Sequence, residues 1–173
     1  MRKTKKFAAI LLSALILSST FSALPVSAAT IERNNQVVSS DQVIKTNYFM
    51  YSIIDNENIK IEKYIGNEKT VVIPDTIEDK SVKFIGNNAF CDCLNLENIS
   101  IPKSVTTIGE SAFQHCIKLK NITIPDKVTN IGSSAFRSCT NLEKVSIPDS
   151  VTSIGQYAFA FCSNLQDFIM PDN

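Results

Sequence analysis

Five cysteines and a single histidine carry the most reactive side chains in this 173-residue chain. His115 directly precedes Cys116, and Cys91 and Cys93 flank Asp92. A thiol nucleophile needs a base within hydrogen-bonding distance and a third group that orients the base. A structural zinc site needs four ligands, and the Cys91-Asp92-Cys93 segment is not followed by a second pair. The sequence therefore predicts no catalytic residue, no metal site and no cofactor.

The spacing of the cysteines indicates a structural role. One column of residues at intervals of 23 contains Cys93, Cys116, Cys139 and Cys162. The same interval separates the members of three more columns, which are Gly86, Gly109, Gly132 and Gly155; Phe90, Phe113, Phe136 and Phe159; and Leu96, Leu119, Leu142 and Leu165. A unit of this length cannot bury its own apolar side, but stacked units align their columns into a continuous core.

Stacking also fixes what the cysteines can do. Equivalent cysteines in adjacent units lie about 5 Å apart, the distance between neighbouring strands. That separation is compatible with a disulfide, yet equivalent side chains point the same way and each would have two competing partners. Cysteine is also a good small apolar core residue, so we predict a ladder of free, buried thiols. Cys91 lies outside this column and is expected to face elsewhere.

The periodicity argues against a dyad of His115 and Cys116. His115 shares its column with Asp92, Ser138 and Phe161, so this position accepts side chains of any kind. Neighbouring residues also point apart. We therefore expect His115 to have no catalytic partner.

Aspartates that follow prolines form another, incomplete column, which contains Asp75, Asp126, Asp149 and Asp172. A ladder of carboxylates is a candidate calcium site. Lys103 interrupts this ladder, and no loop rich in Asp and Gly accompanies it. Aspartate after proline is typical of turns, so we interpret these residues as turn formers.

The elements that position these columns follow from one unit of the repeat. The segment Leu119-x-x-Ile122-x-Ile124 has the apolar spacing of a leucine-rich strand. A period of two directs Ile122 and Ile124 inward and Asn121 and Thr123 outward.

The rest of the unit must return the chain to the next strand. Pro125 ends the strand because proline cannot donate to a ladder. Gly132 permits either a positive φ or a close approach of two backbones. Residues 133–139 are predicted to form one short helical turn that buries Ala135 and Phe136.

One complete unit reads Ile101-Pro102-x-x-Val105-Thr106-x-Ile108-Gly109-x-x-Ala112-Phe113-x-x-Cys116-x-x-Leu119. This motif resembles the BspA-type leucine-rich repeats of bacterial and protist surface proteins. The resemblance covers residues 73–170 and implies an α/β solenoid rich in β-structure. It also implies adhesion at a cell surface, to host matrix proteins or to other cells.

The first unit departs from the motif. The interval from Ile73 to Gly86 is longer than the equivalent interval from Ile101 to Gly109. The additional residues lie near positions 76–80, and we expect them to bulge toward solvent.

The chain divides into four segments. Residues 1–28 combine a basic start, an apolar run and small residues at a cleavage site, as in a secretory signal peptide. Residues 29–46 are predicted to form a flexible leader. Residues 47–72 hold two strand patterns around turn-forming residues and predict an N-terminal β-hairpin cap. Residues 73–173 hold about four repeats. Their last strand begins at Phe168 and is uncapped, which indicates either a fragment of a longer array or self-association through this edge.

Charge narrows the class of partner. The chain has 17 basic and 17 acidic residues. Loss of residues 1–28 leaves 13 basic and 17 acidic residues, a net charge of −4. A mildly acidic domain without a basic stripe is a poor partner for nucleic acid or an anionic membrane. No later segment is apolar and long enough to span a membrane. We therefore expect a secreted or cell-surface protein that binds neither nucleic acid nor a membrane.

The outward columns supply the predicted binding surface, which comprises Asn98, Ser100, Lys103, Asn121, Thr123, Asp126, Lys144, Ser146, Asp149 and Asp167. These side chains are mostly short and polar, and the chain has no Trp, so weak or multivalent binding of a protein ligand is favoured over tight binding by one face.

The predicted function is protein–protein binding. The alternative is a structural spacer, or a fragment of a longer surface protein that presents another domain. An enzyme would need convergent polar groups in a pocket, and the sequence offers none.

Overall fold

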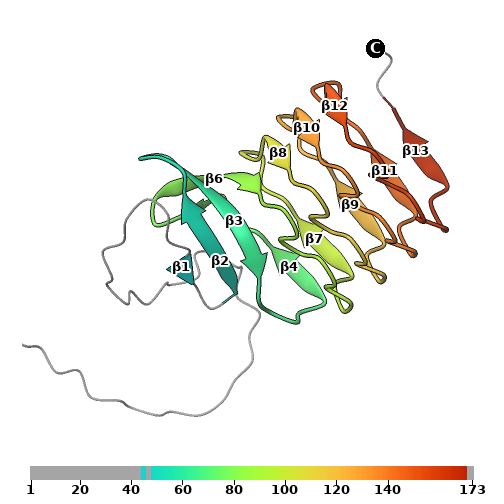
Figure 1. Ribbon diagram of the computed structural model, residues 1–173, viewed down its shortest axis with the longest axis horizontal. Helices are drawn as coiled ribbons and strands as arrows, with labels where there is room; N and C mark the ends of the chain where they lie inside the picture. The colour runs from blue at the N-terminus through green and yellow to red at the C-terminus, as the bar shows by residue number, and fades with distance from the viewer. Residues whose placement is uncertain (1–43, 46–47, 171–173) are drawn as a thin grey trace, which may run out of the picture. The chain divides into compact units, whose positions relative to one another are not determined.

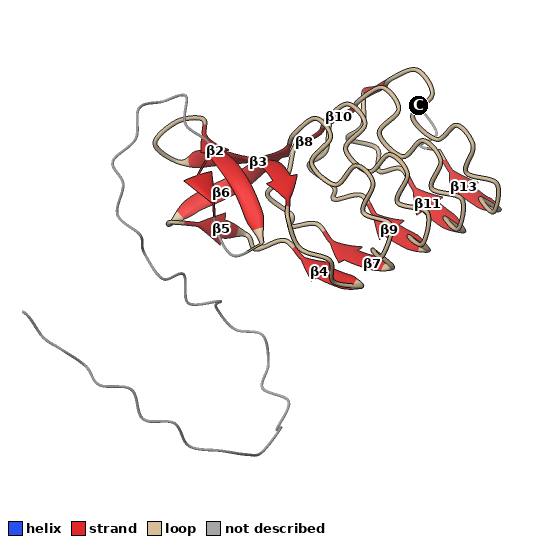
Figure 2. Ribbon diagram, turned by 60° about the horizontal axis from the view of Figure 1, so that its bottom comes forward, coloured by secondary structure: helices blue, strands red, loops and turns tan. Residues whose placement is uncertain are grey.

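The computed structural model describes residues 44–45 and 48–170. The predicted signal peptide at 1–28, most of the predicted leader and Asp172 lie outside the described residues. In the described part every regular element is a β-strand, and the strands are joined by turns and loops (Figure 2). This part contains no helix of the length and apolar character that crossing a bilayer requires.

The described strands form two sheets (Figure 1). The five-stranded sheet has the order β13-β11-β9-β7-β4, with the bounds β4 (Thr70–Val72), β7 (Asn98–Ser100), β9 (Asn121–Thr123), β11 (Lys144–Ser146) and β13 (Asp167–Ile169). The eight-stranded sheet has the order β1-β2-β3-β6-β8-β10-β12, and β5 pairs with β6. Its bounds are β1 (Ile44–Lys45), β2 (Phe49–Ile53), β3 (Asn58–Tyr64), β5 (Thr76–Ile77), β6 (Lys80–Ile85), β8 (Thr107–Ile108), β10 (Asn130–Ile131) and β12 (Ser153–Ile154).

Each repeat adds one strand to each sheet, and equivalent strands pair in parallel. Asn121 in β9 pairs with Lys144 in β11. Asn130 in β10 pairs with Ser153 in β12. Both pairs join residues that lie one full repeat apart in the sequence, so successive coils follow the same path and stack on one another. The prediction of a solenoid is confirmed.

Stacked aromatic rings form the centre of the core. From Phe90 through Phe113 and Phe136 to Phe159, successive ring centroids lie 5.0, 5.2 and 5.1 Å apart. The first three rings are fully buried, and Phe159 is partly buried. The predicted phenylalanine column therefore exists as a continuous stack, which is how the coils shield one another's apolar sides.

The fold is a β-solenoid, and the helical turn predicted over residues 133–139 is wrong. Ser134 and Ser138 have φ values of 54° and 60°, which a right-handed helix does not allow. Such a φ at the third position of a four-residue turn is typical of a type II turn. Between these turns the Phe136 amide donates to Ala158 O of the next coil at 2.7 Å. The backbone thus bonds to its neighbouring coil, where a helix would bond to itself.

Gly132 is required by a close approach of two coils. A Cβ atom at this position would lie 2.5 Å from the backbone nitrogen of Glu110 and 2.6 Å from the carbonyl carbon of Gly109. No glycine in the described part has a positive φ. Of the two roles the sequence allows, backbone proximity is the one that the structure uses.

The additional residues of the first unit form a hairpin. In it, β5 and β6 pair antiparallel, with Thr76 opposite Ser81. Glu78 and Asp79 have φ values of 50° and 61°, as both central residues of a type I′ turn require. Ile77 is only 2% exposed. The expectation that this insertion bulges into solvent is therefore wrong for Ile77, which packs into the core, and holds only for the turn.

The N-terminal strands of the described part join the eight-stranded sheet. Strands β2 and β3 pair antiparallel, as their two sequence patterns predict. Strand β3 then pairs in parallel with β6 of the first coil. Strand β4, which the sequence assigned mostly to the hairpin segment, lies at the edge of the five-stranded sheet beside β7. The role of the hairpin as a cap stays a prediction.

Candidate protein-binding surface

The predicted binding residues all lie at exposed positions along the five-stranded sheet and the turns that follow it. Strands β9 and β11 alternate exposed, buried and exposed residues, because a strand directs successive side chains to opposite faces. On the strands lie Asn98, Ser100, Asn121, Thr123, Lys144, Ser146 and Asp167. In the turns after the prolines lie Lys103, Asp126 and Asp149.

Three consecutive strands hold their outward side chains in unbroken register. Lys144 of β11 pairs with Asn121 on one side and with Asp167 of β13 on the other. Ser146 pairs with Thr123 in the same way. Neighbouring strands are about 4.8 Å apart, so these side chains form short polar rows across the sheet.

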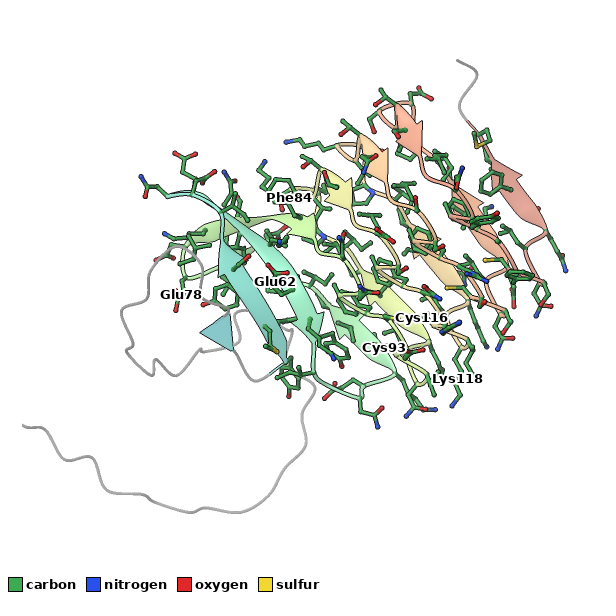
Figure 3. The ribbon with its side chains drawn as sticks, viewed as in Figure 1. Glu62, Glu78, Phe84, Cys93, Cys116 and Lys118 are labelled. Atoms are coloured by element: carbon green, nitrogen blue, oxygen red, sulfur yellow. The ribbon has the colours of Figure 1, made fainter. Side chains whose placement is uncertain are left out.

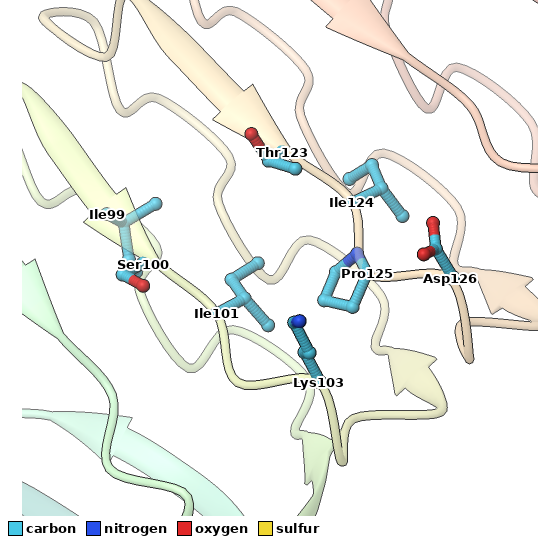
Figure 4. Close-up of a pocket in the computed structure, with 8 residues that line it drawn as sticks. All are labelled: Ile99, Ser100, Ile101, Lys103, Thr123, Ile124, Pro125 and Asp126. Carbon is cyan, nitrogen blue, oxygen red and sulfur yellow. The ribbon is translucent and has the colours of Figure 1, made fainter.

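The register is incomplete between β7 and β9. Asn98 pairs with Asn121, and no further pair joins these two strands in the described sheet. Ser100, which pairs with Val72 on its other side, is therefore not paired with Thr123 as the repeat predicts. A shallow hollow of about 260 Å³ lies between the two coils at this place (Figure 4). It is lined by Ile99, Ser100, Ile101, Lys103, Thr123, Ile124, Pro125 and Asp126.

The charges on this surface are well hydrated. Lys144 Nζ lies 3.9 Å from Asp167 Oδ2, and the two side chains are 56% and 64% exposed. An ion pair with that exposure contributes little to stability and leaves both groups available to a ligand. Lys103 and Asp126 place opposite charges beside the hollow. The arrangement is suited to polar recognition of another surface.

The structure separates His115 from Cys116, as predicted. His115 Nδ1 lies 2.9 Å from Asp92 Oδ1 at the surface. Cys116 is buried, and its Sγ donates a hydrogen bond to Phe90 O at 3.1 Å. Its hydrogen bond with Cys93 and its burial raise the pKa of the Cys116 thiol. A thiol held in the neutral form without a base is not a nucleophile.

The prediction of free, buried thiols is confirmed for three cysteines. Cys116, Cys139 and Cys162 are buried and free, and each Sγ donates to a phenylalanine carbonyl of the preceding coil at 3.1 Å. Burial raises the pKa of Cys139 and of Cys162. Cys93 is also free but only half-buried, and it lies on the coil next to Cys116 (Figure 3). The column therefore serves the core.

Sequence reasoning missed one cluster. The side-chain ligand atoms of Cys91, Asp92 and His115 all lie within 4.8 Å of one another. The position shared by Asp92 and His115 accepts varied side chains but demands a positive φ, which is 59° at both residues. Their separation by one full repeat already placed these two on adjacent coils, and this was the signal that could have revealed the cluster.

Hydrogen bonds within this cluster shift its pKa values. The hydrogen bond with His115 lowers the pKa of the Asp92 carboxyl. Burial, together with the hydrogen bond to Asp92, raises the pKa of the Cys91 thiol to about 11. The aspartates that follow prolines form no comparable group in the described part of the chain, where Asp75, Asp126 and Asp149 are exposed.

Comparison with known proteins identifies the repeat. A family model described as BspA type Leucine rich repeat region matches residues 83–173. The crystal structure of a leucine-rich repeat protein from T. pallidum has 27% sequence identity and a TM-score of 0.62, with 75% of this chain and 72% of that chain covered. A leucine-rich repeat protein from Bacteroides capillosus has 25% identity and a TM-score of 0.66, with 75% and 98% covered.

A longer relative adds a cellular context. The crystal structure of a leucine rich cell surface protein from Faecalibacterium prausnitzii has 28% identity and a TM-score of 0.58. The match covers 72% of this chain but only 38% of that protein. None of the curated proteins matches the chain.

Proposed function

Because the chain belongs to the BspA type leucine-rich repeat family, we propose that it is a cell-surface or secreted module that binds another protein through the exposed face of its five-stranded sheet. The observation that carries this proposal is the fixed register of exposed side chains on β9, β11 and β13. A rigid sheet presents these groups with little loss of conformational freedom on binding.

The chemistry of the surface favours modest affinity at each site. Its columns are mostly short polar residues, and the chain has no Trp, the side chain most enriched in binding hot spots. The exposed pair of Lys144 and Asp167 adds specificity more than affinity. Useful binding strength then comes from several copies acting together on one cell surface.

The proposed partner is a protein of the extracellular space, either a host matrix protein or a protein on another cell. The F. prausnitzii relative supports this location, because it is described as a cell surface protein. Adhesion is the activity that follows from many weak contacts between two surfaces.

A matched pair of arginine variants tests the proposal. Ser146 is exposed on β11 of the five-stranded sheet, and Ser153 is exposed on β12 of the eight-stranded sheet. Binding of the purified chain to immobilised extracellular matrix proteins and to whole cells should be saturable. Ser146→Arg should weaken it more than about tenfold, since a buried, unpaired charge in an interface costs about 2–5 kcal/mol. Ser153→Arg should leave it unchanged.

Equal effects of both variants, or no saturable binding at all, would contradict the proposal. A structural spacer is the second candidate, and the small polar side chains of the exposed columns favour it. As a spacer, the chain would bind nothing through either sheet, and neither arginine variant would change its behaviour.

A further inference from the structure

The cluster of Cys91, Asp92 and His115 combines three different metal-ligating groups in one place. Cys91 Sγ donates to Asp92 Oδ2 at 3.4 Å, and His115 Nδ1 lies 2.9 Å from Asp92 Oδ1. Within residues 44–45 and 48–170 this is the only group of three such side chains whose ligand atoms lie that close together. The protein-binding surface proposed above does not include it.

The backbone fixes the positions of these side chains. The Asp92 amide donates to Gln114 O at 2.9 Å, and the His115 amide donates to Arg137 O at 2.9 Å. Each turn is thus bonded to the following coil and holds its residue at a φ of 59°. The side chains of His115 and Asp92 are 44% and 66% exposed, so an ion can reach them from solvent.

We propose that Cys91, Asp92 and His115 form a binding site for Zn²⁺, with water as the fourth ligand. A thiolate, an imidazole nitrogen and a carboxylate oxygen are the ligand types that zinc prefers, and three protein ligands leave one position open. Tetrahedral coordination at normal zinc distances separates the ligand atoms by about 3.3–3.6 Å. The observed ligand atoms lie within 4.8 Å of one another, so the widest pair must approach by up to about 1.2 Å to reach this spacing.

The protons are accounted for by ordinary exchange with solvent. Zinc displaces the thiol proton of Cys91, which passes to water or buffer, and no electrons are transferred. His115 binds through Nδ1, so its ring proton resides on Nε2. His115 Nε2 lies 3.5 Å from the side-chain nitrogen of Gln114. Rotation of that amide presents its oxygen as the acceptor, and such a partner orients a zinc-binding imidazole.

The positive charge of Lys63 opposes the binding of Zn²⁺, and its removal provides a further test. The Lys63 ammonium acts electrostatically on Cys91. A positive charge near the site repels a divalent cation. Lys63 also lowers the pKa of the Cys91 thiol, which favours the thiolate. Because zinc replaces a single proton there, binding adds one net positive charge, so Lys63→Gln should tighten zinc binding, in the opposite direction to every ligand substitution.

The ion would join two coils. Cys91 and Asp92 belong to one coil, and His115 belongs to the next. A ligand that binds only the folded state raises its stability. Zinc should therefore raise the melting temperature of the purified chain, a readout that needs no protein partner.

Residues that already occupy the equivalent positions supply variants that should fold. The column of Cys91 contains Ala160, and the column of Asp92 and His115 contains Ser138. The test set is accordingly Cys91→Ala, Asp92→Ser and His115→Ser. Cys93→Ala is the matched control, because it removes a half-buried thiol close to Cys91 in the sequence that is not part of the site.

Zinc affinity is measured by competition with a chromophoric chelator, and Co²⁺ serves as a spectroscopic probe. The expected result is one equivalent of zinc per chain and a thiolate-to-cobalt charge-transfer band. Each of the three ligand variants should weaken affinity about tenfold or more and abolish the rise in melting temperature. Absence of stoichiometric binding, or a loss of binding with Cys93→Ala and not with Cys91→Ala, would overturn the proposal.

Discussion

The phenyl ring of Phe136 lies 5.2 Å from that of Phe113 and is inclined to it by only 3°. Both rings are completely buried. Each is the apolar neighbour that the adjacent coil needs, so the stability of the array depends on contacts between coils more than on contacts within one.

Removal of one ring from this stack should destabilise the whole array. Phe136→Ala is expected to lower the free energy of unfolding by about 3–5 kcal/mol, because it deletes a fully buried ring and leaves a cavity. Urea denaturation followed by circular dichroism measures this loss. The control is Phe161→Ala, since Phe161 is 66% exposed and its ring centroid lies 5.2 Å from the guanidinium carbon of Arg137. It should lose about 1 kcal/mol or less, and an equal loss in both variants would place Phe136 outside the core.

Addition of a single methyl group between two coils should also be harmful. In Gly132→Ala the new Cβ would lie 2.5 Å from the backbone nitrogen of Glu110, so the two coils must separate. We expect a loss of about 1–3 kcal/mol in the free energy of unfolding. Thermal unfolding of the variant beside Ser133→Ala, a change at the exposed neighbouring position, separates this effect from a general one. A neutral Gly132→Ala would show that the coils are not closely packed there.

A β-branched residue placed in one of the turns with a positive φ should destabilise the fold. Ser134→Val should destabilise the chain by about 1–2 kcal/mol, since a β-branched residue is strongly disfavoured at a φ of 54°. Ser133→Val is the control, because Ser133 is exposed in the same turn and is not among the residues with positive φ. The urea midpoint of Ser134→Val should be lower than that of Ser133→Val. Indistinguishable midpoints would mean that a β-branched residue is tolerated at the positive φ of position 134.

The cysteines should differ in their reaction with iodoacetamide. Cys116, Cys139 and Cys162 are buried, and burial contributes to the raised pKa of each, so they should react only when the chain unfolds. Mass spectrometry of peptides labelled with and without urea distinguishes them. Rapid labelling of Cys139 in the native chain would contradict the described core.

The accessible thiol of Cys91 should show a clear pH dependence in metal-free buffer. Its pKa is raised to about 11 by burial and by Asp92. The thiolate is the reactive form, so the alkylation rate should rise about tenfold per pH unit from neutral pH toward the pKa. Asp92→Asn removes a negative charge that disfavours the thiolate, and it should accelerate labelling at a fixed pH. A rate that is flat with pH would exclude the raised pKa.

The sequence predicted those features of the fold that depend on period alone. A constant repeat length places Phe113 beside Phe136 whatever the path of the chain between them. The path itself was not predictable, because the positive φ positions that replace the expected helix are occupied by residues such as Ser134 and Tyr157. Glycine and asparagine are the usual sequence signals for such a conformation, and in this column only Asn88, with a φ of 57°, carries one.

The candidate site was predictable to the same extent. Alternation in β9 and β11 identified the exposed residues of the sheet correctly. Pairing between β7 and β9 ends after one residue pair, next to the hollow at Ser100. This feature depends on the packing of two particular coils and has no sequence signature. In the cluster at His115, the repeat length predicts that Asp92 and His115 lie on adjacent coils, whereas the position of Cys91 beside them depends on the path of the turn and has no sequence signal.

The nearly constant spacing of the stacked rings means that the length of the array is set by the number of its coils. Each coil moves the chain forward by one ring spacing, between 5.0 and 5.2 Å. In-frame duplication or loss of one repeat unit would change the reach by that fixed increment and leave every surviving contact between coils intact. Recombination within such a gene therefore changes the length of a repeat protein in discrete steps, without redesign of the packing within each coil.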